Sequence, residues 1–270
     1  MDLEAARAFI AGVDLSGTPR HLDFVAQAVT DDASRVFDQA KNQAQVVASS
    51  IFSFAVGVDA QVREAISDSA LLAQLVANKQ VAAFETDPQK WFGAYASVLQ
   101  TLGWVLQDSA WNDYSSTGTG AEVNEHILDV LAIVLGPGAS ALAIAKATIG
   151  ALQAMNTNGP WLTLFDRETQ KANLARFQIG LVQTGPNDDV FVSLIACIVK
   201  ATKEITQILF FKFRAERADF RANVQKVSIN RPALVELGPR IRQRVLAYQL
   251  AYLSTLDDLG PIPGVDPPTG

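Results

Sequence analysis

The chain has 270 residues, of which 49% are apolar, and a formal net charge of −6. A chain of this length and composition can bury a sizeable core. The acidic balance argues against nonspecific binding to nucleic acid, because no excess of Lys and Arg is present to displace counterions. We therefore expect no nucleic-acid partner, and the single cysteine excludes an internal disulfide.

The N-terminal stretch "MDLEAARAFIAGVDLSG" has acidic residues near its start and no long apolar run, so it does not resemble a signal peptide. We expect synthesis in the cytoplasm without a signal peptide. Release by another route and association with a membrane remain open. No run of about 20 uninterrupted apolar residues is present.

The first half of the chain shows helical spacing of apolar residues. It predicts helical structure over 18–54, with Thr18 and Pro19 as a start signal, and a helix over 60–77. A further helix is expected after Asp87, which can cap it, with Pro88 in the first turn. Residues 108–122 are rich in Ser, Thr, Gly and Asn and predict a surface loop.

The segment from Ile127 to Leu152 is strongly apolar but is broken by Asp129, by Gly-Pro-Gly at 136–138 and by Lys146. It predicts two core helices. The alternative is a helical hairpin that inserts into membranes.

After Gly159-Pro160 the pattern changes to period two. Alternation over 175–181 predicts a strand with one buried face, and 184–189 predicts a turn. Strands are also expected over 206–229. A shift of phase within that stretch predicts a β-bulge near Gln225 and Lys226. A helix is expected again over 238–256.

This order of elements predicts an α+β fold, in which helical layers pack on a mostly antiparallel sheet. The helices lie mainly in the first half of the chain and the strands in the second. We expect one domain over 1–256 and a Pro-rich flexible tail over 257–270. A domain boundary near residue 158 is the alternative.

Motifs typical of enzymes are scarce. His21 and His126 have no partner at metal-ligand spacing, and no phosphate-binding or dinucleotide fingerprint is present. We therefore expect no catalytic residues, no metal and no nucleotide, and a binding protein rather than an enzyme. The alternative is an acyl-transfer enzyme in which Cys197 is the nucleophile and meets a histidine in space.

The only cysteine, Cys197, lies in the apolar segment "VFVSLIACIVKA". On a helix it shares a face with Val190 and Leu194, and on a strand with Phe191 and Ile195. Either way its neighbours are aliphatic, so burial keeps a free thiol inert. An acyl thioester suits such a site, because each buried CH₂ contributes about 0.8 kcal/mol. The residues expected to line a lipid site with Cys197 are Val190, Phe191, Leu194, Ile195, Ile198, Phe177 and Ile179.

The layout resembles the Erwinia virulence factor family and, more distantly, the cytolytic δ-endotoxins of Bacillus. The stretches that carry the resemblance are "PWLTLFDRETQKANLARFQIG", "VFVSLIACIVKA" and "ILFFKFRAERADFRANVQKVSI". The resemblance implies an α/β/α layered fold. It also implies a cysteine that carries palmitate as a thioester in a hydrophobic tunnel, and Cys197 matches that residue by position.

The leading hypothesis is a lipid-binding, S-acylated protein of the virulence or toxin-like class, with a palmitate-like fatty acid as its covalent group. Its expected partners are a lipid or membrane and a host-cell target. A pore-forming cytolysin-like toxin and the Cys197 enzyme are the alternatives, and a plain structural or interaction protein, in which the cysteine is only structural, is the simplest explanation.

Overall fold

The structure is a computed structural model. It describes residues 2–16, 18, 43–81, 87–107, 110–114, 170–171, 173–185, 187, 189–201 and 219–253, together with short helical pieces between 125 and 147. One sheet dominates, with strands in the order β1-β2-β6-β7-β8-β3, while β4 pairs with β8 and β5 with β6. The strands are β1 (Gln43–Val47), β2 (Ser50–Phe54), β3 (Trp104–Leu106), β4 (Asn112–Tyr114), β5 (Gln170–Lys171), β6 (Leu174–Thr184), β7 (Val190–Lys200) and β8 (Asp219–Ile229).

Three long antiparallel strands form the centre of the sheet. Strand β7 pairs with β6 on one side and with β8 on the other along its whole length. The turn predicted over 184–189 joins β6 to β7, and the amide of Gly185 donates to the carbonyl of Asp189 at 2.8 Å. Strand β2 pairs with β6 in parallel, whereas the other pairs are antiparallel. The predicted α+β class is confirmed.

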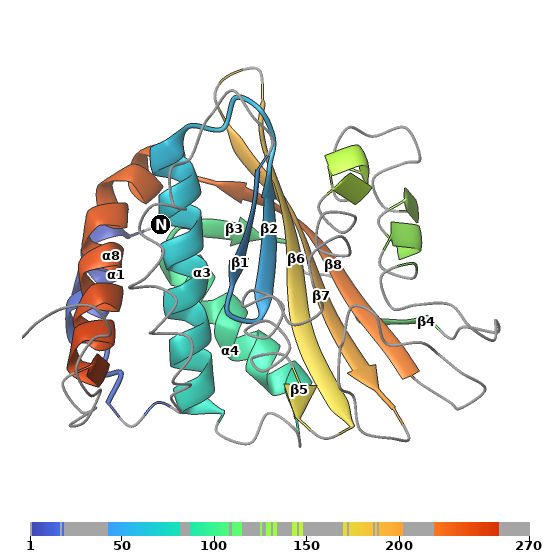
Figure 1. The fold of residues 1–270 in the computed structure, drawn as a ribbon. Coiled ribbons are helices and arrows are strands. Elements are labelled where there is room, and N and C mark those ends of the chain that lie inside the picture. Colours follow the sequence, from blue (N-terminus) through green and yellow to red (C-terminus); the bar gives the residue numbers. More distant parts are fainter. Residues whose placement is uncertain are drawn as a thin grey trace, which may run out of the picture.

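Four helices cover one face of the sheet (Figure 1). They are α1 (Leu3–Gly12), α3 (Ala60–Gln80), α4 (Pro88–Thr101) and α8 (Arg231–Leu253). The carboxylate of Asp59 caps α3 by accepting from the amide of Val62 at 2.8 Å, and Asp87 caps α4 in the same way. The described helical pieces between 125 and 147 lie on the opposite side of the sheet (Figure 1), so the sheet lies between helical layers.

The prediction of helix over 18–54 is wrong for its last part. Residues 43–54 form the hairpin of β1 and β2, and Ala48 in its turn has a φ of 48°. The stretch is rich in Val, Ile and Phe, which favour strands. Every residue of β2 is buried, because the strand lies between β1 and the central strand β6. Its place inside the sheet therefore decides its conformation.

The predicted bulge near Gln225 and Lys226 is also wrong. The register between β7 and β8 runs without interruption from Val190↔Ile229 to Lys200↔Asp219. The phase of burial nevertheless changes along β8, because Phe220 is buried on one face of the strand and Val227 on the other. Val227 packs in the core with the helices, whereas Phe220 points to the opposite face, so the pattern shifts although the backbone stays regular.

Several predicted features lie outside the described residues. These are the helical structure over 19–42, the strand over 206–218, the tail over 257–270, both histidines, and most of the 108–122 loop and the 127–152 segment. None of the described helices combines the length and the hydropathy that a membrane-spanning helix requires. The expectation of a single domain over 1–256 stays a prediction.

Candidate functional site

The thiol of Cys197 lies in the middle of the sheet. Cys197 belongs to β7, and its direct neighbours across the strands are Phe177 of β6 and Ala222 of β8. All three side chains are fully buried. Burial raises the pKa of the Cys197 thiol well above its usual range, so the free thiol stays protonated and unreactive at neutral pH. Of the two conformations left open by the sequence, the strand is the one observed.

Side chains on a strand alternate between its faces, so the sheet centre has two distinct faces. We call the side that packs on α3, α4 and α8 the helix face, and the opposite side the Cys197 face. The helix face includes the even-numbered residues of β7, which belong to the core shared with the helices. On β6, β7 and β8 the buried side chains of the Cys197 face are all apolar, within the described residues: Ala175, Phe177, Ile179, Leu181, Ile195, Cys197, Val199, Phe220 and Ala222.

The seven residues predicted to line a lipid site divide between these two faces. Phe177, Ile179, Ile195 and Phe191 share the Cys197 face, although Phe191 is 46% exposed near the turn. The other three lie on the helix face, where they pack in the core with the helices: Val190, Leu194 and Ile198. The structure thus brings four of the seven together with Cys197, and separates the remaining three from it by the thickness of the sheet.

The helix face contains a buried polar network. Gln74 of α3 donates to the carbonyl of Val47 at 2.9 Å and accepts from the hydroxyl of Ser49 at 2.6 Å. Its amide nitrogen also donates to the hydroxyl of Ser50 at 3.2 Å, and Ser50 in turn donates to Oε1 of Gln178 on β6. The network fixes the Gln178 side chain, because its partner Ser50 is itself held by the hydrogen bond from Gln74.

A buried arginine, Arg176, joins this network beside Trp91 by donating to the hydroxyl of Ser49 at 3.2 Å. The guanidinium of Arg176 lies 3.6 Å from the centroid of the Trp91 ring and donates to Oδ1 of Asn78 at 2.9 Å. The indole of Trp91 donates to the same Asn78 oxygen at 2.8 Å. Cation–π contact and hydrogen bonds therefore position one side of α4 against β6.

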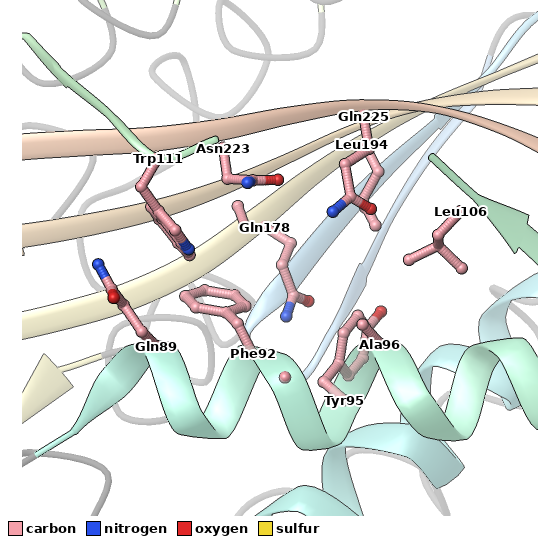
Figure 2. Close-up of a pocket in the computed structure, with 12 residues that line it drawn as sticks. Gln89, Phe92, Tyr95, Ala96, Leu106, Trp111, Gln178, Leu194, Asn223 and Gln225 are labelled. Carbon is pink, nitrogen blue, oxygen red and sulfur yellow. The ribbon is translucent and has the colours of Figure 1, made fainter. Parts of the chain in front are cut away.

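A cavity of about 190 Å³ lies next to this network, between α4 and the helix face of the sheet (Figure 2). Its walls come from α4, from the three central strands, and from the segments around Leu106 and Trp111. The residues that line it are Gln89, Phe92, Gly93, Tyr95, Ala96, Leu106, Trp111, Gln178, Leu194, Ala196, Asn223 and Gln225.

Sequence reasoning did not find this cavity. Its residues come from five separate stretches of the chain, so no local motif marks it. A signal was present, however. Gln178 interrupts a mostly apolar strand, and Asn223 and Gln225 share one face of β8 with Val227 and Ile229. A polar side chain on a buried strand face needs a partner.

Among the described residues, no group of three or more His, Cys, Asp or Glu side chains is placed to hold a metal ion. The centre of the sheet offers two different environments, an apolar one around Cys197 on one face and a polar and aromatic one in the cavity on the other.

No protein-family model matches the chain. No curated protein matches it either. Among solved structures, the chain is similar to a δ-endotoxin, with 14% identity, a TM-score of 0.40, and coverage of 68% of this chain and 81% of that one. It is similar to the activated Cyt2Ba monomer from Bacillus thuringiensis subsp. israelensis, with 15% identity, a TM-score of 0.39, and coverage of 68% and 97%. It is also similar to the Evf virulence factor, with 11% identity, a TM-score of 0.32, and coverage of 84% and 89%. These solved structures include both groups that the sequence resemblance named.

Proposed function

We propose that this chain is a toxin-like virulence protein that binds a fatty acyl chain on the Cys197 face, with Cys197 as the attachment point. The observation that supports the proposal is the position of the sulfur. Cys197 is fully buried between Phe177 and Ala222, on a face whose buried side chains are apolar. In such surroundings an acyl chain gains about 0.8 kcal/mol per buried CH₂, and its thioester is protected from water.

The sheet decides on which side the acyl chain lies. Ala196 and Ile198 flank Cys197 and point to the helix face, whereas the sulfur points to the other face. Hydrogen-bonded strands on both sides of β7 leave no passage through the sheet. The acyl chain therefore packs against Phe177, Ile179 and Ile195, and not against the helix-face residues.

The covalent step is a thioester exchange with a fatty acyl thioester donor. The sulfur of Cys197 forms a bond to the acyl carbonyl carbon, the bond from that carbon to the donor sulfur breaks, and the thiol proton goes to the donor thiolate. The nucleophile in this exchange is the thiolate. Because burial raises the pKa of the thiol in the folded protein, loading takes place before the Cys197 face is covered.

The raised pKa also argues against the alternative of a Cys197 acyl-transfer enzyme, because repeated turnover needs an ionised thiol in the folded state. The acyl group instead serves the stability of the protein and its encounter with a membrane or host surface. The pore-forming alternative depends largely on 127–152, most of which lies outside the described residues.

Intact mass spectrometry of protein purified under native conditions tests the proposal. We expect added mass that corresponds to a fatty acyl group, removed by neutral hydroxylamine, which cleaves thioesters. The Cys197→Ala variant should lack this mass, whereas Ala196→Ser, which changes the neighbouring residue on the other face, should retain it. A native protein with unmodified mass and no extractable fatty acid would contradict the proposal.

A further inference from the structure

We propose that the cavity between α4 and the helix face is a second binding site, and that it takes a neutral sugar ring. The inference is independent of acylation, because the cavity and the sulfur lie on opposite sides of the sheet. Three observations support it: the access to the cavity, its unpaired amide groups, and its aromatic walls without charge.

The cavity has a buried inner end and an open rim. Gln178 and Tyr95, at the inner end, are almost completely inaccessible to solvent. Gln89, Gly93 and Trp111, at the rim, are partly or fully exposed. A ligand can therefore enter from the surface beside α4 and reach the polar network. A volume of about 190 Å³ suits a single small ring rather than a long chain.

The inner end presents a polar atom that has no partner. Ser50 hydrogen-bonds Oε1 of Gln178, while Nε2 of the same amide has no partner within the described part of the chain. Figure 2 shows the amide of Gln178 pointing from the sheet toward α4, between Phe92 and Tyr95. Because Ser50 takes one of the two polar atoms of the amide, the other is left for a molecule in the cavity.

A second amide group supplies the complementary function. Oε1 of Gln225 is buried and unpaired in the described structure, and Gln225 lines the same cavity. A buried polar atom without a partner costs about 1–3 kcal/mol. The cavity thus offers a donor and an acceptor, and a ligand that carries both, such as a hydroxyl-bearing ring, satisfies them together.

The walls determine the chemical class. The described lining residues include Phe92, Tyr95 and Trp111 and contain no charged side chain. Burial also raises the pKa of the Tyr95 phenol, so it stays neutral. An anion or cation would find no countercharge here, and a hydrocarbon would leave the amides unpaired. A sugar ring has apolar C–H faces that pack on aromatic rings and hydroxyls that donate and accept hydrogen bonds.

Saturation-transfer NMR on the full chain tests the site, with methyl glucoside, methyl galactoside and N-acetylglucosamine as probes. We expect transfer to at least one of these sugars. Replacing Gln178 by Leu should weaken binding about tenfold, because one buried hydrogen bond is lost. Trp111→Ala, which removes an aromatic wall, should weaken it by a similar factor. Gln100→Leu changes an exposed glutamine of α4 away from the cavity and should leave binding unchanged.

A second arm separates a free sugar from a lipid headgroup. Vesicles that contain a neutral glycolipid are compared with plain phosphatidylcholine vesicles in a sedimentation assay. Binding only to glycolipid vesicles, lost in Trp111→Ala, assigns the site to a headgroup, whereas binding of the free sugars alone assigns it to soluble saccharides. If Gln178→Leu does not fold, Gln225→Met and Trp111→Ala, which alter partly exposed positions, give the same comparison. Absence of binding in both arms, or binding that is equal in the cavity variants and in Gln100→Leu, would overturn the proposal.

Discussion

On the helix face of strands β6 to β8, three buried side chains are polar, namely Arg176, Gln178 and Asn223. The buried side chains of the Cys197 face on these same strands are all apolar, with the thiol of Cys197 at their centre. Both faces are built from the same backbone, so the difference comes only from which residues occupy alternate positions.

This contrast indicates two kinds of binding environment in one sheet. The helix face tolerates polar groups because α3 and β2 supply hydrogen-bond partners such as Gln74 and Ser50. Among its buried positions on β6, β7 and β8, the Cys197 face supplies no polar side chain, so it suits a hydrocarbon. Added volume should therefore lower stability most on the packed helix face. An added polar group should lower stability more on the Cys197 face than on the helix face.

The largest effect is expected where the helix face is packed most tightly. A Cβ added at Gly180 would lie 2.4 Å from the ring of Phe52, which is itself fully buried and cannot move away. We expect Gly180→Ala to lower the free energy of unfolding by about 3 kcal/mol. Urea unfolding measures it, with Gly12→Ala as the control, because nothing lies within 4 Å of a Cβ at Gly12. An equal and small effect of both changes would show that the Phe52 ring does not block this position.

The next effect compares neighbouring residues on opposite faces. Cys197→Ser places a hydroxyl among Phe177 and Ala222 and should cost about 2 kcal/mol, because the hydroxyl has no partner there. Ala196→Ser places the same group beside the cavity and should cost less than about 1 kcal/mol. Urea unfolding of hydroxylamine-treated proteins gives both values. Equal costs would remove the distinction between the faces.

The smallest effect is one of pH, and a buried titratable group on each side of the sheet, Cys197 and Tyr95, contributes to it. In the hydroxylamine-treated protein, which carries the free thiol, burial raises the pKa of Cys197, so above about pH 9 the unfolded chain loses the thiol proton while the folded chain retains it. The contribution of the buried thiol to the free energy of unfolding is therefore fully present below that pH. It falls as pH rises, by at most about 1.4 kcal/mol per pH unit. Cys197→Ala should remove this decline.

Tyr95 provides the matching test on the helix face. Burial also raises the pKa of Tyr95, so the loss of stability that this group causes begins near pH 10. Tyr95→Phe should remove this later part of the decline only. Urea unfolding of hydroxylamine-treated proteins between pH 8 and pH 10.5 separates the two. A decline in Cys197→Ala that begins at the same pH as in the unchanged protein would contradict the burial of the thiol.

Much of the architecture could be predicted from local patterns. Asp87 and Pro88 marked the start of α4, and alternation over 175–181 marked β6, because capping and period two depend on neighbouring residues alone. The hairpin of residues 43–54 was missed, since its strand conformation depends on pairing with β6, which lies more than a hundred residues away. The assumed bulge failed for a similar reason, because the buried face of β8 changes along its length while its pairing with β7 stays regular.

The sequence by itself determined that Cys197 would be surrounded by aliphatic side chains, because they are its immediate neighbours in the chain. Only the tertiary structure decided which of them share its face. Strand geometry sends Ile195 to the side of the sulfur and Leu194 to the helices. The cavity was likewise decided by assembly alone, because α4, β6 and β8 bring Gln178, Gln225 and Trp111 together from distant parts of the chain.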